Sequence, residues 1–380
     1  VIINQEVLKM RFTCKTSVLA KAVQTAKKAI SSNPSTPIFS GIHLIASTNQ
    51  LEIQAMDLNM AIGCQIEANV AESGNIVIPA KYFSDLLATL QSEEVNIYKN
   101  ADESTVSIES GKANFQIVLM DENDYPAFPS VDGEEKLIIS DEVMKDLIKK
   151  TIYARSTDET RPLFTGILFE KKGSNLTFVG TNTHRLAIKT VEVENSEEKD
   201  FSMIIPGRLL TEVVNSLNSD LPQSVVISLH NRQIIIKIGK TTIVSSLVEG
   251  EFPDYKRVIP PKFEIKTKVN IKELEGAVKR VSLFSADGDY SIVKISVKNS
   301  EIVVNSSGND VGKGRESVSC VTEGASLNVA FNARYILDIL KNIDAEEATI
   351  ELNNSLSPVC IKPVSEENYL YIVTPVRVVF

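Results

Sequence analysis

The chain reads Ile78-Pro79-Ala80-Lys81-Tyr82-Phe83 in its first third, and this pattern returns twice. The second copy is Ile205-Pro206-Gly207-Arg208-Leu209-Leu210 and the third is Phe331-Asn332-Ala333-Arg334-Tyr335-Ile336. Successive copies are 127 and 126 residues apart, measured at their basic residue. Repeats of about 20–50 residues are typical of solenoids and propellers, whereas a period this long is the size of a whole domain. The sequence therefore predicts three tandem copies of one domain.

Each copy is expected to contain two helices. The first helix is marked by Ser, Thr, Asp or Asn before an amphipathic run, a pattern typical of a helix start. The second helix begins within the repeated pattern itself. The first helices are predicted at 18–30 after Thr16-Ser17, at 143–153 after Ser140-Asp141 and at 271–283 after Asn270; the second helices begin at Ala80, Gly207 and Ala333.

Strand pairs are expected after each helix, because apolar and polar residues alternate there and turn-forming residues lie between the runs. Helices segregated over mostly antiparallel strands indicate an α+β domain. Short proline-containing linkers near 128–133 and 259–262 give predicted domains at 10–130, 131–260 and 261–380, with residues 1–9 as a short leader. The strand pairs are 41–45 with 51–55, 95–98 with 105–109, 166–169 with 176–179, 224–229 with 233–238, 293–297 with 302–304, and 348–352 with 359–362.

The composition is that of a soluble globular protein, with 43% hydrophobic and 23% charged residues. No apolar run approaches the roughly 18–20 residues of a transmembrane helix. The four cysteines, Cys14, Cys64, Cys320 and Cys360, are scattered without a CxxC spacing, so neither disulfides nor zinc is expected. We therefore expect a cytoplasmic protein without a membrane partner.

The net charge of −9 argues against a simple nucleic-acid binder, whose usual footprint is an overall basic domain. Basic residues nevertheless recur at corresponding positions. If the domains curve into an arc, these residues could line a concave face and contact phosphates without reading sequence. A solvated face on each helix is the alternative. The recurring residues are Lys81, Arg208 and Arg334, and the looser pairs Lys27-Lys28, Lys149-Lys150 and Lys279-Arg280.

No catalytic constellation is evident. His43 and His230 lie in or at the end of predicted strands and are interpreted as structural. His184 follows a strand but lacks a local nucleophile and an orienting acid. Gly308–Gly314 resembles a phosphate loop but lacks the Ser or Thr after its Lys. The chain is therefore predicted to be no enzyme and to need no metal or cofactor; an active cleft at His184 and Arg185 is the alternative.

Five segments together resemble the bacterial sliding clamps, the β subunits of DNA polymerase III, and the resemblance extends from Met10 to the C-terminus. It implies the DNA clamp fold, in which two chains join head to tail as a six-domain ring around duplex DNA. Such a ring slides without sequence preference and gives the polymerase its processivity. A linear monomeric scaffold is the alternative. The five segments are Thr36–Ile38, Arg161–Gly166, Thr181–Ala187, Glu251–Val258 and Thr374–Arg377.

The resemblance also implies partners and sites. The partners are a second copy of the chain, double-stranded DNA, the replicative polymerase α subunit, clamp-loader subunits and other proteins with a clamp-binding motif. Leu283 and Phe284 would meet Phe115 and Ile117 of the next copy, unless all four are core residues. Arg155 and Arg161 join the residues above as DNA-facing candidates. The peptide pocket would be walled by Phe164, Thr181, Thr183, His184, Arg185, Leu186, Pro253, Arg257, Val258, Tyr290, Leu356, Pro358, Ile372, Val373, Thr374, Pro375, Val376 and Arg377.

Overall fold

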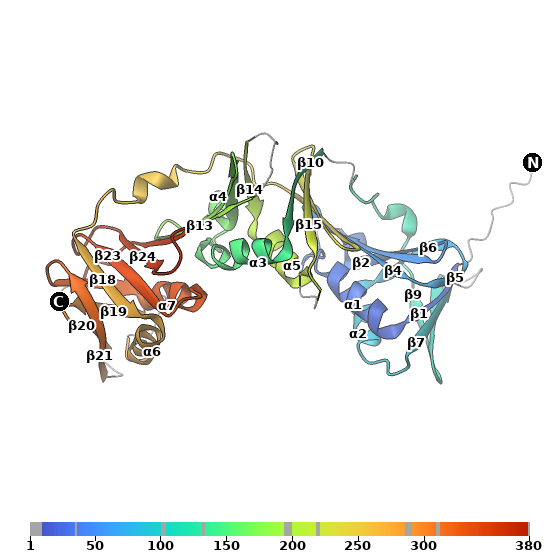
Figure 1. Ribbon diagram of the computed structural model, residues 1–380. Helices are drawn as coiled ribbons and strands as arrows, with labels where there is room; N and C mark the ends of the chain where they lie inside the picture. The colour runs from blue at the N-terminus through green and yellow to red at the C-terminus, as the bar shows by residue number, and fades with distance from the viewer. Residues whose placement is uncertain are drawn as a thin grey trace, which may run out of the picture. The chain divides into compact units, whose positions relative to one another are not determined.

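The computed structural model describes residues 10–34, 36–99, 104–130, 134–193, 200–217, 221–285, 291–308 and 312–378 (Figure 1). Tyr290, expected in the pocket, lies outside these residues. The chain forms two compact units. The first unit comprises Val1–Asp141 and Thr211–Leu247, and the second comprises Glu142–Leu210 and Val248–Phe380.

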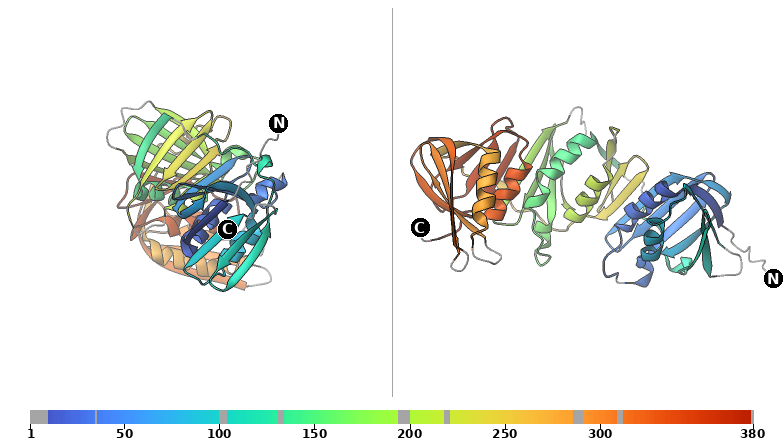
Figure 2. Two further views of the ribbon diagram at one scale, coloured as in Figure 1. Left: turned by 90° about the vertical axis from the view of Figure 1, so that its right-hand side faces the viewer. Right: turned by 90° about the horizontal axis from the view of Figure 1, so that it is seen from below.

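The first unit contains two antiparallel sheets, ordered β5-β1-β7-β8-β9 and β10-β15-β16-β17-β4-β3-β2-β6. Helix α1 (Thr16–Lys27) packs against β3 and β4 and beside α2 (Ala80–Leu87), as the right-hand view of Figure 2 shows. The strands are β1 Met10–Lys15, β2 Gly41–Ser47, β3 Gln50–Met56, β4 Met60–Glu67, β5 Asn69–Glu72, β6 Gly74–Pro79, β7 Glu94–Lys99, β8 Thr105–Ser110, β9 Ala113–Val118, β10 Glu134–Ser140, β15 Ser224–His230, β16 Gln233–Ile238 and β17 Thr241–Ser246.

The second unit is built on a sheet ordered β14-β11-β12-β13-β25-β24-β23-β18-β21-β20-β19-β22. Its helices are α3 (Asp141–Lys149), whose first residue belongs to the first unit, α4 (Pro162–Thr165), α6 (Ile271–Ser282) and α7 (Ala333–Asn342); α5 (Gly207–Ser216) carries the chain into the first unit. The strands are β11 Gly166–Lys172, β12 Asn175–Thr181, β13 Arg185–Glu192, β14 Phe201–Pro206, β18 Ile265–Asn270, β19 Ile292–Val297, β20 Glu301–Gly308, β21 Gly312–Glu323, β22 Leu327–Asn332, β23 Glu347–Leu352, β24 Val359–Pro363 and β25 Tyr369–Val373.

The same strand pairing occurs once in each unit. In the first unit β17 pairs antiparallel with β4, and we call this pairing the first junction. In the second unit β25 pairs antiparallel with β13, and we call this pairing the second junction. The fourth residues of β4 and β13 are Gly63 and Ile188, which face Thr242 and Leu370 respectively. The two junctions therefore have the same register.

Amphipathic helices close the cores. Helix α6 buries Ile271, Leu274, Ala277, Val278 and Val281, the spacing of one helix face. These residues belong to one apolar cluster with strands β18 to β25. Fully burying such a side chain contributes roughly 1.5–3 kcal/mol relative to leaving it in water. Packing of this face, rather than helix propensity, holds α6 in place.

The second helix of each repeat begins at Ala80, Gly207 and Ala333, which confirms those predictions. Asn270 caps α6 as expected, since its side chain accepts a hydrogen bond from the Glu273 amide at 3.1 Å. The predicted Thr16-Ser17 cap is wrong. Thr16 is already helical, and its amide donates to the Glu93 carbonyl at 2.8 Å. A neighbouring backbone carbonyl thus takes the place of a side-chain cap.

Two predicted helices end earlier than expected. Helix α1 ends at Lys27 rather than Ile30, and α3 ends at Lys149, followed by a separate 3₁₀ turn at Ile152–Ala154. All six predicted strand pairs are present. The junction strands were not predicted, because β4 is buried on both faces over its first five residues and so lacks alternation.

Candidate functional site

The second junction presents an apolar surface. Leu186 of β13 faces Ile372 of β25, and both side chains are almost fully buried. They join a cluster with Leu168, Val179, Ile204 and Cys360. Partly buried side chains from the linker that follows the sheet, including Phe252 and Tyr255, pack against this cluster. The sequence-predicted pocket residues Leu186 and Ile372 are thus brought together, on paired strands from distant parts of the chain.

The turn before β13 is held by its own side chains. The Thr181 hydroxyl accepts from the Thr183 amide at 3.1 Å and donates to the Arg185 carbonyl at 2.7 Å. The Asn182 side-chain oxygen accepts from the amides of His184 and Arg185, each at 3.1 Å. Thr183 has a φ of 77°, a strained conformation for a branched residue. These bonds fix the turn and leave Thr183 and His184 exposed.

The C-terminal segment lies beside this turn. The Thr374 amide donates to the His184 carbonyl at 2.9 Å, and the Val376 amide donates to the Ala330 carbonyl at 2.8 Å. Thr374 and Arg377 are exposed, whereas Pro375 is buried. The predicted wall residues at 372–377 are therefore anchored to both the central and the third repeat.

Arg185 is placed differently from a pocket wall. Its side chain is only 9% exposed, and its guanidinium donates to the Asp338 carboxylate and to the Tyr153 carbonyl. The guanidinium also lies 4.6 Å from the ring centroid of Tyr335. Among the described residues, Arg185 Nε has no hydrogen-bond partner. The Arg185 side chain therefore anchors β13 to helix α7. Only the backbone of Arg185 is available to line the predicted pocket.

Two of the predicted wall residues are exposed apolar side chains. Val258 is 49% exposed and Leu356 is 51% exposed. Phe164 meets Phe252 edge to face at 6.4 Å between ring centroids. The remaining expected wall residues are the exposed Pro253 and Arg257, the half-buried Pro358 and Val376, and the fully buried Val373.

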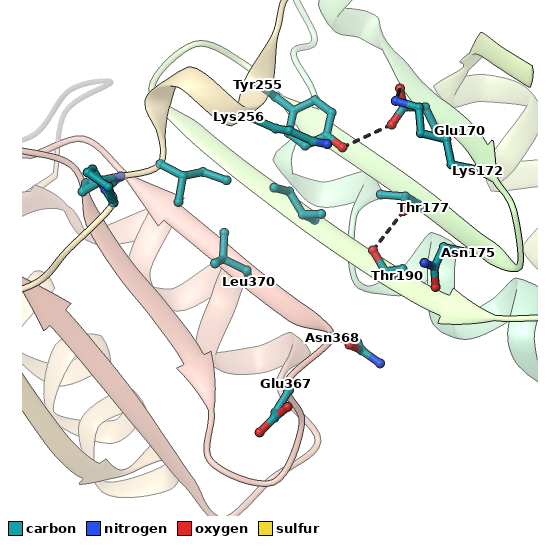
Figure 3. A pocket seen from close by; sticks show the side chains of 14 residues that line it. Glu170, Lys172, Asn175, Thr177, Thr190, Tyr255, Lys256, Glu367, Asn368 and Leu370 are labelled. Atoms are coloured by element: carbon teal, nitrogen blue, oxygen red, sulfur yellow. Dashed lines mark hydrogen bonds and ion pairs between the residues drawn. The ribbon is translucent and has the colours of Figure 1, made fainter.

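A groove of about 670 Å³ is lined by residues of β11, β12, β13 and β25 and of the linker after the central repeat (Figure 3). Ile188 and Leu370 form its floor, and one wall is formed by the linker residues Tyr255, Lys256, Ile259, Pro260 and Pro261. The Tyr255 hydroxyl donates to Glu170 at 3.2 Å, and burial together with the Glu170 charge raises the pKa of Tyr255 to about 12. Sequence reasoning missed this groove. The sequence signal that could have predicted it is the pair of apolar residues two positions apart, Leu186 and Ile188, which place an apolar face on one side of the strand.

The recurring basic residues occupy matching places in the structure. Lys81, Arg208 and Arg334 are each the second residue of α2, α5 and α7, and all three are exposed. A cation is normally disfavoured in the first turn of a helix, because the helix dipole is positive there. Helix stability therefore does not explain their presence.

The other expected DNA-facing residues are less uniform. Lys150 is the clearest departure, because it is buried and paired with Asp146 and Glu366, both at 2.8 Å. Arg155 is half-buried and packs on Gly207, and burial lowers its pKa. The exposed or partly exposed residues with ion-pair partners are Lys27 with Asp85, Lys28 with Glu212, Lys149 with Asp344, Arg161 with Asp158, and Arg280 with Glu316; Lys279 is exposed.

The four residues expected at a contact between copies are accessible to different degrees. Leu283 is 72% exposed, Phe115 is 38% and Phe284 is 37%, and Ile117 is half-buried. A Cβ atom at Gly314 would lie 2.9 Å from the Phe284 ring, so that ring lies against the β21 backbone. Because Leu283 is largely exposed, the alternative that all four are core residues does not hold.

Two further observations concern the described residues. No group of three or more His, Cys, Asp or Glu side chains among them could hold a metal ion. No helix within this part of the chain is long and apolar enough to cross a membrane.

Three family models match the chain in sequence order. The N-terminal domain of the DNA polymerase III beta subunit matches residues 10–129, the central domain matches 138–254, and the C-terminal domain matches 256–377. Curated relatives include the beta sliding clamps of Staphylococcus epidermidis and Staphylococcus aureus. Each is 30% identical over 377 residues, which cover 97% of this chain and 99% of the relative.

Solved structures agree with these matches. The DNA polymerase sliding clamp from Bacillus subtilis has a TM-score of 0.92 at 30% identity and covers 97% of this chain and 100% of its own. The DNA polymerase III beta subunit from Thermotoga maritima has a TM-score of 0.90 at 27% identity, with the same coverage. A sliding clamp from Pseudomonas aeruginosa, solved bound to griselimycin, has a TM-score of 0.89 at 25% identity.

Proposed function

This chain belongs to the family of DNA polymerase III beta subunits, the bacterial sliding clamps, and from that premise we propose how its own residues serve a processivity factor. The family consists of accessory subunits of the polymerase, and the three repeats are three tandem clamp domains. The clamp has no catalytic site of its own and acts by topology. A closed ring cannot leave a duplex, so a tethered polymerase stays at high effective concentration at the primer end.

The ring is a head-to-tail homodimer. The observation that carries this proposal is the repeated junction, since β4 pairs with β17 and β13 pairs with β25 in the same register. In the third repeat, the strand that corresponds to β4 and β13 is β21. In the first repeat, the strand that corresponds to β17 and β25 is β9. Strand β9 ends its sheet. In β21, Gly312–Ser319 pair with β20 on one side, and no second ladder for them occurs among the described residues.

The register of the missing junction follows from the two that exist. Ile62 in the β3–β4 hairpin and Ala187 in the β12–β13 hairpin occupy the position that Gly314 has in the β20–β21 hairpin. The residues that face Ile62 and Ala187 across the two junctions are the third residues of their strands, as Phe115 is in β9. Phe115 of one copy would therefore face Gly314 of the next. Gly314 lies against Phe284, so the Phe115 and Phe284 rings could pack together with the exposed Leu283. Pairing of these two edges would satisfy their backbone hydrogen-bonding groups and would bury the exposed apolar side chains at the same time.

Duplex DNA is held by charge and not by base reading. Lys81, Arg208 and Arg334 are exposed at one position of three equivalent helices, where they could contact phosphates. Phosphate contacts give affinity that is independent of sequence and weakens with salt. Such weak, uniform contact permits sliding. Lys150 is unsuited to this role because it is buried in ion pairs.

Partner proteins bind by a short linear motif at the second junction. The exposed Val258 and Leu356 could bury the motif's apolar anchors, and the exposed His184, Arg257 and Arg377 could orient it. The replicative polymerase α subunit, clamp-loader subunits and repair proteins would compete for this surface. His184 is then a wall residue and not a general base.

The dimer is tested by sedimentation equilibrium at micromolar concentration. We expect twice the 41.8 kDa mass of the chain for the wild type and the monomer mass for Phe115→Asp combined with Leu283→Asp. Leu221→Asp is the matched control, because Leu221 is 74% exposed but lies far along the chain from either edge. A wild-type mass of 41.8 kDa would contradict the proposal.

The DNA contact is tested by retention of the loaded protein on circular DNA. The triple variant Lys81→Glu, Arg208→Glu, Arg334→Glu should be lost faster and should show a flatter salt dependence. The control triple is Lys172→Glu, Lys240→Glu, Lys298→Glu, which changes the charge equally at other exposed lysines. Equal retention of the two triples would remove these helices from the DNA-facing surface.

A further inference from the structure

The groove at the second junction has the properties of a binding site that extends the peptide pocket. We propose that it binds the segment flanking the pocket-bound motif of a partner protein, in extended form, with one apolar side chain seated over Ile188 and Leu370. The proposal rests on the proposed function of the neighbouring pocket. It adds a second contact to that pocket and predicts a preference outside the motif itself.

The groove floor lies on the same two paired strands as the expected pocket residues Leu186 and Ile372. Side chains two positions apart on a strand share one face of the sheet, so Ile188 lies beside Leu186 and Leu370 lies beside Ile372. The register confirms this arrangement, since Leu186 faces Ile372 and Ile188 faces Leu370. All four belong to or pack against one apolar cluster. A chain leaving the pocket would need to travel only about 7 Å, two residues of extended backbone, to reach this floor.

The groove walls are already fixed. Tyr255 is bonded to Glu170, which also pairs with Lys172 at 3.0 Å, and the Thr177 and Thr190 hydroxyls are bonded to each other at 2.9 Å. The linker wall also includes Pro260 and Pro261, whose backbone is stiff. A preformed groove costs little conformational entropy when a ligand binds.

The groove has the polar groups that an extended segment needs. Asn175 and Asn368 are exposed amides at its edge, and Lys256 and Glu367 place exposed charges of opposite sign on its lining (Figure 3). The amides could bind backbone groups of a peptide, while the floor takes an aliphatic side chain. A volume of about 670 Å³ lies within the roughly 300–1,000 Å³ of typical ligand sites.

The first junction provides an internal comparison. A groove of about 470 Å³ lies at the corresponding place, lined by Gly63, Thr242 and Gln65. Gly63 and Thr242 face each other at the positions that Ile188 and Leu370 occupy in the second junction. The apolar floor is therefore not a requirement of the junction. It is a property of the repeat pair that also carries the proposed pocket.

The experiment uses the full-length clamp and labelled peptides of one design. Each peptide contains a Leu/Phe motif from the polymerase α subunit, extended at one end by six Gly and Ser residues, with a single Leu placed at each extension position in turn. Fluorescence anisotropy gives the dissociation constants. At one position near the motif we expect Leu to tighten binding by about fivefold to tenfold over the Gly/Ser extension, as partial burial of a leucine predicts.

The variant Ile188→Thr combined with Leu370→Thr should abolish this gain while leaving the affinity for the unextended motif unchanged. Val321→Thr is the control, since Val321 is an exposed valine in another strand of the same unit. If no Leu position tightens binding, or if the gain survives in the groove variant, the proposal is overturned. If the unextended motif itself fails to bind, or its binding is unaffected by Leu356→Asp, the proposed function of the pocket fails instead.

Discussion

At the first junction Gly63 faces Thr242, and the linker that follows lies close over them; at the second junction Ile188 faces Leu370, and the corresponding linker leaves them partly open. A Cβ atom at Gly63 would lie 3.2 Å from the Phe128 ring. The strands, the register and the linker position are equivalent. The two junctions therefore differ in what covers the same face.

The linker aromatics show how the difference arises. Tyr125, in the first linker, is 8% exposed and packs in a cluster with Ile38, Phe39 and Val244. Phe252, at the same place in the second linker, is only half-buried. The two repeats thus keep the same strand pairing but cover it with linker aromatics that are buried to different depths.

Removing the deeper aromatic should have the largest effect. Tyr125→Ala should destabilise the first unit by about 4 kcal/mol, because it leaves a cavity and removes the hydroxyl contact to the Gln54 carbonyl. Phe252→Ala should cost about half as much, since its ring is already partly solvated. Hydrogen exchange of the β4 and β13 amides measures the two effects separately. Equal protection losses would contradict the comparison.

The buried ion pair is the next distinction. Arg185 begins β13 and pairs with Asp338, whereas Met60 begins β4. Asp338→Ala should cost about 3 kcal/mol, because it leaves a buried guanidinium without its counter-ion.

Chemical unfolding followed by exchange at β13 and β25 checks this prediction. Asp85→Ala is the control, since Asp85 is 65% exposed and its pair with Lys27 should contribute less than about 1 kcal/mol. A loss for Asp338→Ala no greater than the control would show that Arg185 does not need this partner.

Peptide binding should distinguish the junctions by about tenfold. Leu356→Asp places a carboxylate among the expected anchors and should weaken a Leu/Phe motif peptide at least that much. Thr242→Asp, at the first junction, should leave the affinity unchanged.

His184→Ala sharpens the same test, since it should weaken the peptide only modestly and abolish no reaction. Calorimetric titration measures all three variants. A turnover that depends on His184 would favour the enzyme alternative.

The smallest expected effect concerns Tyr255, which stands where the first linker has Phe128. The pKa of Tyr255 is raised to about 12, above the value of about 10 for an unfolded tyrosine. The stabilisation of the folded protein by the neutral Tyr255 hydroxyl is therefore complete below about pH 10 and is lost as the pH rises through about 12.

Tyr255→Phe should remove one tyrosinate that titrates near pH 12 by ultraviolet absorbance, and should cost about 1 kcal/mol through the lost hydrogen bond to Glu170. Tyr125→Phe gives the corresponding measurement at the buried position of the first linker. Loss of a tyrosinate that titrates near pH 10 instead would show that this hydroxyl ionises as in water.

Much of the fold could be predicted because its signals are local. The starts of α2, α5 and α7 at Ala80, Gly207 and Ala333 lie within the repeated pattern, and the predicted hairpins alternate. The junction strands escaped prediction because β4 is apolar on both faces and pairs with a strand about 180 residues away. Pairing at such a distance leaves no local pattern in the sequence.

The candidate site was predicted by resemblance and then corrected by burial. Leu186 and Ile372 do meet, and Val258 and Leu356 are exposed as a binding surface requires. Arg185 and Lys150 look in the sequence like any other basic residues, yet both are buried in ion pairs. Charge is readable from a residue's name, whereas its solvation depends on what packs around it.

The threefold repeat of one domain could be read directly from the amino-acid sequence, as could the basic residue in the first turn of the same helix in each copy. These facts are local, because a helix start and a hairpin are specified by neighbouring residues. The three-dimensional structure was needed to show which strands form the two junctions and which strand edges remain unpaired among the described residues. It also placed Gly63 and Thr242 in the groove of the first junction and the apolar Ile188 and Leu370 in the groove of the second. Those outcomes depend on long-range pairing and on the depth of a linker, which no short stretch of sequence specifies.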